Sequence, residues 1–223
     1  MKKTIYLHIG SGKTGTTSIQ DMLHKNQKYL NDNGYLYPKT GRRGSGHHSL
    51  AEYRGKIISQ EYRELLKSLK EEIVNSTCEN IVISSEFFMF IKDNYLDYFY
   101  KEFKEFHCVV VVYIRQQIKL IESTFLQWQK TGDDYLNINR FFQLHKNSFD
   151  FNQRLSRWEN YFGKENIKLR LFEKKIIGED VCIDFLRTIS FTHANILKSE
   201  YSNTSLLPEF SKLILLIDGT STE

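Results

Sequence analysis

A run of β-favouring residues covers positions 108–114, and four of its members are consecutive valines. Shorter runs of the same kind cover residues 4–9 and 80–85. Strands that are apolar along their whole length, rather than at every second position, are typical of a parallel sheet covered on both faces. These runs therefore predict buried parallel strands and an α/β fold.

Helical spacing of apolar residues alternates with these strands. The resulting β-α-β-α order predicts an α/β fold in three layers around a doubly wound, mostly parallel sheet. A length of 223 residues suits a single domain over 1–223. Ligands of such sheets bind beyond the carboxyl ends of the strands. We expect helices over 16–33, 61–74, 95–106, 117–130 and 151–162, a short strand over 35–37, a loop over 40–49 and a last strand over 167–172.

Composition narrows the class of protein. The 31 Lys and Arg residues exceed the 27 Asp and Glu residues by four, which is less than a general nucleic-acid binder usually shows, so we expect no nucleic-acid partner. Three cysteines, far apart and odd in number, indicate reduced thiols and a cytoplasmic compartment. The apolar runs are too short for a signal peptide or a transmembrane segment.

A glycine-bearing segment, residues 10–15, joins the first strand to the first helix. Backbone N–H groups at the start of a helix have no partner within the helix and bind anions. Lys13 adds a full positive charge, and Thr16, Thr17 and Ser18 add hydroxyl donors. The sequence therefore predicts a phosphate-binding loop after the first strand.

Two segments of the sequence carry a resemblance to a known family. The first is the run Lys13-Thr14-Gly15-Thr16-Thr17-Ser18, and the second is Arg115, at the end of the valine-rich strand, with Ser123 eight residues on. They resemble, in turn, the 5′-phosphosulfate loop and the pair that grips the 3′-phosphate in the sulfotransferases that use 3′-phosphoadenosine-5′-phosphosulfate (PAPS). Arg offers a planar fork of donors to phosphate oxygens, and Ser adds one hydroxyl.

The likeness is closest to bacterial glycan sulfotransferases. It continues more weakly through residues 155–167 and 201–206, but the late nucleotide loop of the steroid and phenol enzymes has no counterpart here. The resemblance implies PAPS as the donor, no metal, and a carbohydrate or lipid-linked glycan as the acceptor. It also implies that Lys13 stabilises the phosphate that leaves in an in-line displacement.

The general base has two candidates. Glu86 follows the strand over 80–85, near the place where the resembling family often has a catalytic His or Glu. His48 is the rival, in a polar loop beside Arg42 and Arg43. Side chains of adjacent residues in an extended segment point opposite ways, so only one of His47 and His48 is expected to face the site.

An ATP-dependent P-loop kinase acting on a small molecule is the alternative function. Gly12, Lys13 and Thr14 match the end of the nucleoside-triphosphatase pattern GxxxxGK[ST]. Its first glycine should then occupy position 7, where Leu7 stands inside the strand. The valine-rich strand also ends in Arg115, where a kinase would place an Asp to hold magnesium.

Overall fold

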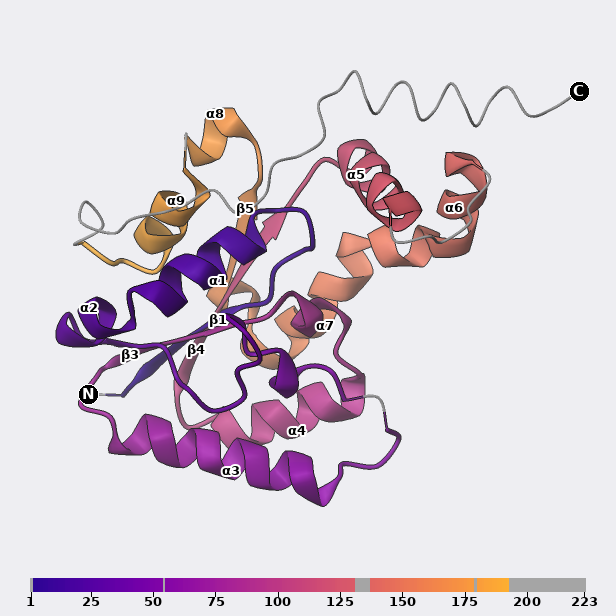
Figure 1. Ribbon diagram of the computed structural model, residues 1–223. Helices are drawn as coiled ribbons and strands as arrows, with labels where there is room; N and C mark the ends of the chain where they lie inside the picture. Colours follow the sequence, from indigo (N-terminus) through magenta and orange to yellow (C-terminus); the bar gives the residue numbers. More distant parts are fainter. Residues whose placement is uncertain (1, 54, 131–136, 179, 193–223) are drawn as a thin grey trace, which may run out of the picture.

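A five-stranded sheet forms the centre of the computed structural model, which describes residues 2–53, 55–130, 137–178 and 180–192. The strands lie in the order β2-β3-β1-β4-β5, and every neighbouring pair is parallel, which confirms the predicted α/β class. Figure 1 shows the sheet between two groups of helices. The strands are β1 (Thr4–His8), β2 (Tyr35–Leu36), β3 (Asn80–Ser84), β4 (His107–Ile114) and β5 (Ile167–Leu171).

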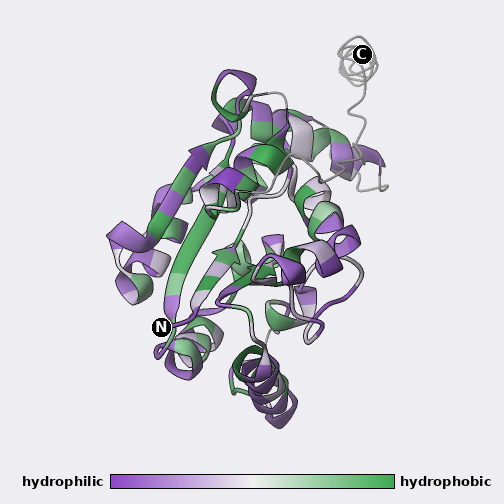
Figure 2. Ribbon diagram, turned by 90° about the vertical axis from the view of Figure 1, so that its left-hand side faces the viewer, coloured by the Kyte–Doolittle hydropathy of each residue, from purple (hydrophilic) through white to green (hydrophobic). Residues whose placement is uncertain are grey.

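Helices cover both faces of this sheet, and each face has its own hydrophobic core. Ile5 and Leu7 of β1 contribute to one core, whereas Tyr6 contributes to the other, because successive strand residues point to opposite faces. Hydrophobic colour in Figure 2 follows the central strands and the inner sides of the helices. The first core is covered by α3 (Gln60–Asn75), α4 (Asp93–Phe103) and α7 (Phe151–Phe162), and the second by α1 (Thr16–Lys25), α2 (Gln27–Asp32) and α9 (Val181–Thr188).

A third, smaller core lies between α5 (Gln117–Lys130) and α6 (Ile138–His145). These two helices lie together to one side of the sheet in Figure 1. Periodicity predicted α5 with its observed bounds but did not predict α6, a helix of only eight residues. The buried members of this core are Leu120, Phe125, Phe141 and Phe149.

The helix predicted over 16–33 is instead two helices, α1 and α2. At the break, the backbone N–H and the side-chain amide of Asn26 both donate to the carbonyl of Met22, at 3.1 and 2.7 Å. Asn side chains compete in this way for backbone groups, which interrupts a helix. The short helices α8 (Lys174–Ile177) and α9 were also not predicted, and residues 201–206 lie outside the described ranges. Within those ranges, no helix has the length and apolar character required to cross a membrane.

Candidate active site

The carboxyl ends of β1, β3 and β4 lie next to one another. His8, the last residue of β1, is in register with Ser84 of β3 and Val111 of β4. The loop after β1 therefore meets Glu86, which follows β3, and Arg115, which follows β4. Three sequence-predicted site elements thus share one edge of the sheet.

The loop after β1 has an unusual backbone. Gly10, Lys13 and Gly15 have φ angles of 49°, 67° and 77°. Such values cost glycine little, but Lys13 carries a Cβ, so its conformation is uncommon and costs about 1–2 kcal/mol. The hydroxyl of Thr14 donates to the carbonyl of Ser11 at 2.5 Å and helps to hold this turn. Strained residues of this kind cluster at ligand-binding sites.

Two glycines allow the loop to pack tightly against its neighbours. A Cβ on Gly10 would lie 2.9 Å from Cγ2 of Thr16, and one on Gly15 would lie 2.8 Å from Cγ1 of Val181 in α9. Thr16 is buried, and its hydroxyl lies 3.3 Å from the carbonyl of Ser11. The Thr14 and Thr16 hydroxyls are thus engaged within the loop. The exposed Thr17 and half-buried Ser18 stand at the start of α1, which has no acidic residue in its first turn.

Three cations gather beside this loop. Burial lowers the pKa of the Lys13 ammonium, and the positive charges of Lys130 and Arg115 lower it further. Within the described parts of the chain, no hydrogen bond or ion pair engages these three side chains. Like charges brought together without a counter-ion disfavour one another, and a bound anion relieves that cost. The loop, the helix start and these cations therefore fit a phosphate-bearing ligand.

Helix α5 carries Ser123 and Lys130. Ser123 is half-buried and lies eight residues after Arg115 in the chain, and its contact with a 3′-phosphate stays a prediction. Lys130 lies seven residues after Ser123, a spacing that places both on one helix face. Reasoning from sequence missed Lys130, although this helical period was a signal that would have identified it.

Glu86 and His48, the two rival bases, lie side by side. Nδ1 of His48 is 3.8 Å from Oε2 of Glu86 and 3.0 Å from Oγ of Ser85. The side-chain amide of Gln20, from α1, donates to the same Glu86 oxygen at 2.9 Å. Phe87 packs edge-on against the His48 ring, at 4.9 Å between ring centroids. The side chains of Glu86 and His48 remain 28% and 16% exposed, so both are accessible at this edge.

His47 anchors the loop that carries His48. Its backbone N–H donates to the carbonyl of Ser84 at 2.7 Å, and the N–H of Ser84 donates to His47 Nδ1 at 3.1 Å. Nε2 consequently carries the proton and donates to the carbonyl of Pro38 at 3.0 Å. Burial is the main reason why the pKa of His47 is lowered to about 3. Of the two adjacent histidines, therefore, His47 is buried in the structure and His48 faces Glu86.

His8 is a second fully buried histidine. Its Nδ1 lies 2.8 Å from the hydroxyl of Ser84, and its ring packs against Tyr113 and Phe185. Burial lowers the pKa of His8 to about 3. Both buried rings therefore stay neutral at neutral pH.

The two buried histidines predict that the folded protein becomes less stable as the pH falls. Below about pH 6.5 the unfolded chain takes up a proton at His47 that the folded chain refuses until about pH 3, so stability falls as pH falls through that window. Each such histidine lowers the free energy of unfolding by about 1.4 kcal/mol for each unit by which the pH falls within this window. Urea unfolding at pH 6.5, 5.5 and 4.5 should show the stability difference between wild type and His47→Gln shrinking by that slope. His107→Gln, on the exposed surface, is the control, and equal slopes for both variants would contradict the prediction.

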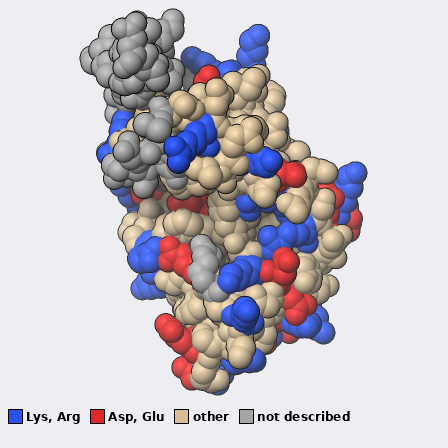
Figure 3. All heavy atoms as spheres, turned by 90° about the vertical axis from the view of Figure 1, so that its right-hand side faces the viewer, with Lys and Arg blue, Asp and Glu red and all other residues tan. Residues whose placement is uncertain are grey.

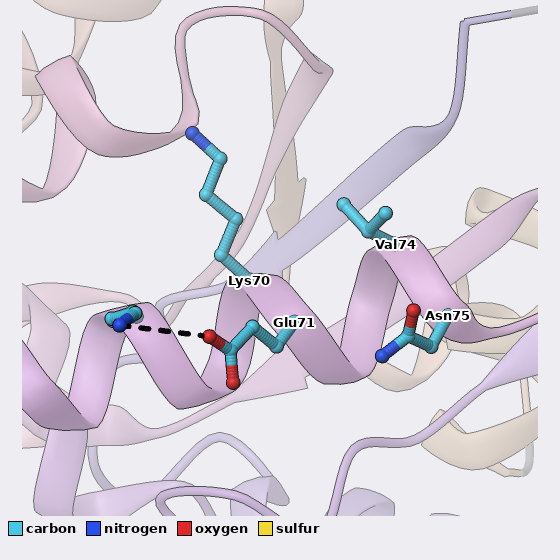
Figure 4. A pocket seen from close by; sticks show the side chains of 5 residues that line it. Lys70, Glu71, Val74 and Asn75 are labelled. Carbon is cyan, nitrogen blue, oxygen red and sulfur yellow. Dashed lines mark ion pairs between the residues drawn. The ribbon is translucent and has the colours of Figure 1, made fainter.

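A surface hollow of about 320 Å³ lies elsewhere, on α3. Figure 4 shows its lining, in which Lys67 pairs with Glu71 at 3.9 Å. Lys70 pairs in turn with Glu105 at 3.2 Å. The hollow is near the end of α3, which leads into the amino end of β3 and hence lies at the opposite edge of the sheet. Its charges are paired, so we do not assign it to the site. The lining residues are Lys67, Lys70, Glu71, Val74 and Asn75.

The architecture places the chain among α/β proteins with a parallel, doubly wound sheet and a glycine-bearing loop between β1 and α1. In many proteins of this class the start of the helix after such a loop binds phosphate groups. Among the described residues, no group of three or more His, Cys, Asp or Glu side chains is placed to hold a metal ion. Metal independence stays a prediction.

A comparison with solved structures finds a protein with a similar fold. The chain is similar to the crystal structure of a sulfotransferase from Alicyclobacillus acidocaldarius, with a TM-score of 0.55 and 13% sequence identity. The match covers 98% of this chain and 93% of that chain. No protein-family profile and no curated protein matches the sequence. At this identity the comparison establishes a shared sulfotransferase fold.

Proposed function

We propose that the protein transfers a sulfuryl group from PAPS to a hydroxyl of a carbohydrate-like acceptor. The observation that carries the proposal is the meeting of Lys13, Arg115 and Lys130 beside a glycine-bearing loop, with Glu86 at the end of the neighbouring strand. A donor with phosphate at both its 5′ and 3′ ends needs separate cationic contacts. Lys13 and Arg115 come from the ends of two different strands and supply them.

The residues divide the chemistry between them. The acceptor oxygen forms a bond to sulfur while the bond from sulfur to the 5′-phosphate oxygen breaks. Glu86 takes the proton of the acceptor hydroxyl, and Lys13 stabilises the negative charge that appears on the departing phosphate. The products are a sulfate ester and adenosine 3′,5′-bisphosphate. In this proposal Thr17, Ser18 and the N–H groups that open α1 hold the 5′-phosphate, and Arg115 with Ser123 holds the 3′-phosphate. Thr14, Gly15 and Thr16 shape the loop.

Aromatic side chains near Glu86 support a sugar acceptor. Phe88 and Tyr95 are buried in the core, but Phe90 is 42% exposed and Phe87 is half-buried. Aromatic faces stack on the apolar faces of sugar rings.

Figure 3 shows basic side chains interspersed with acidic ones on the face that it presents, rather than a continuous basic band. We propose a glycan or lipid-linked glycan acceptor and, since the three cysteines are free and buried, a cytoplasmic compartment.

A P-loop kinase is the alternative, and one observation favours it. Glu86 follows β3, which is adjacent to β1, so its carboxylate stands where a kinase would use an acid to hold magnesium. Against this, Leu7 is fully buried inside β1, paired with Ile83 and Val110, and does not belong to the loop. The glycine pattern of a triphosphatase is therefore incomplete.

Donor identity can be tested by calorimetry in excess EDTA. Adenosine 3′,5′-bisphosphate should bind more tightly than AMP by about 1.5–3 kcal/mol, the usual worth of a charge-assisted hydrogen bond to phosphate. Arg115→Gln should remove most of this preference, because the proposed contact of Arg115 is made to the 3′-phosphate, which AMP lacks. Arg63→Gln, on the exposed side of α3, is the matched control and should preserve it.

Equal affinity for the two nucleotides would rule out the proposed donor site. Tight binding of ADP that requires magnesium would instead support the kinase. A labelled-donor screen of sugars and glycolipids then identifies the acceptor.

A further inference from the structure

Helix α1 carries a buried glutamine on its apolar side. Gln20 is 3% exposed and lies among Ile19, Met22 and Leu23, which face the core. Burying an amide costs free energy unless its donors and acceptors find partners. A polar side chain in this place therefore needs a specific partner.

The partner of Gln20 is Glu86. Nε2 of Gln20 donates to Oε2 of the Glu86 carboxylate at 2.9 Å. An ionised carboxylate only accepts hydrogen bonds, so the amide must present its nitrogen to Glu86. Within the described residues, Oε1 of Glu86 has no hydrogen-bond partner.

Gly46 limits the space around the side chains of Gln20 and His48. A Cβ on Gly46 would lie 2.8 Å from Oε1 of Gln20 and 2.7 Å from Nε2 of His48. The backbone at Gly46 thus packs against both side chains and limits the space into which the amide can turn. Gln20 also stands four residues after Thr16, one helical turn from the phosphate-binding loop.

We propose that Gln20 is a positioning residue for proton transfer. By holding Oε2 of Glu86, the amide leaves Oε1 as the oxygen that takes the proton of the acceptor hydroxyl. The same helix that presents its first turn to the donor then fixes the carboxylate that serves the acceptor. This inference rests on the proposed sulfuryl transfer and assigns the working oxygen of its base.

Gln20→Met is the principal test, because Met has a similar length and no donor. Turnover should fall about 10- to 100-fold, as expected when a reacting group loses its orientation. The dissociation constant of adenosine 3′,5′-bisphosphate should stay within about twofold, since no donor contact is removed.

Two further variants separate positioning from packing. Gln20→Glu places a second carboxylate against Glu86 and should slow turnover at least as much as Gln20→Met. Gln27→Met, in the adjoining helix α2, removes a glutamine amide that, among the described residues, hydrogen-bonds only to His24, and it should leave turnover and donor affinity unchanged. Thermal unfolding of each variant checks that the fold is retained. If Gln20→Met lowers stability but leaves turnover at its wild-type value, Gln20 is a structural residue and the proposal is wrong.

A measurement on the free protein tests the hydrogen bond without activity. The side-chain amide signals of Gln20 in ¹H–¹⁵N NMR spectra should shift on Glu86→Gln and stay in place on Glu79→Gln. The absence of a selective shift overturns the inference even when transfer is intact. A wild-type protein that binds no adenosine 3′,5′-bisphosphate overturns the proposed function, and the assigned role of Gln20 with it, even when the amide shift is present.

Discussion

Replacement of Lys13 by alanine is expected to lower turnover by a factor of about 100 or more, the usual effect of removing one group that stabilises charge in the transition state. The ammonium lies beside the loop, where burial lowers its pKa and the positive charges of Lys130 and Arg115 lower it further. Its contribution is greatest when the departing phosphate oxygen becomes negative. Donor affinity should therefore fall much less than turnover, and single-turnover rates with calorimetry separate the two.

The backbone at Lys13 requires its own control. Its φ of 67° is unfavourable for alanine but not for glycine. If the lost charge is the cause, Lys13→Gly should be as slow as Lys13→Ala, whereas recovery in the glycine variant would assign the loss to loop strain. Lys28→Ala, on the exposed surface of α2, should have no effect. Wild-type turnover in Lys13→Ala would remove Lys13 from the mechanism.

Replacement of Glu86 by glutamine is expected to slow transfer by about 10²- to 10⁴-fold, the range for loss of a general base. Glutamine keeps the shape of the side chain, so donor binding should persist. His48→Ala should mainly weaken acceptor binding, because His48 adjoins Glu86 through its Nδ1, at 3.8 Å. Single-turnover rates and acceptor KM values for the two variants distinguish these roles.

The opposite pattern would identify His48 as the base. In that case His48→Ala would abolish transfer while Glu86→Gln raised the acceptor KM. Near-wild-type turnover in both variants would exclude both residues. Glu79→Gln, at the other end of β3, is the matched control for removal of a carboxylate.

Much of the scaffold was predictable because burial on both faces leaves a strong local signal. The valine-rich run became β4, and the strand over 80–85 became β3, because apolar residues without alternation suit only a covered sheet. The glycine-bearing loop could likewise be predicted, since a strand, a turn and a helix follow one another directly in the chain. Short helices such as α6 were missed, because eight residues carry too few turns for a clear period.

What the sequence by itself determined was the set of elements and the chemistry at each strand end: an anion-binding loop, an arginine after one strand and a glutamate after another. Tertiary structure alone decided which of these groups meet. The charge of Lys130 acts on Lys13 only because the fold brings the end of α5 near the loop, and His48 lies beside Glu86 because His47 pairs with Ser84. These contacts join residues far apart in the chain, and their existence depends on parallel strands ending at one edge, which no local pattern of residues encodes.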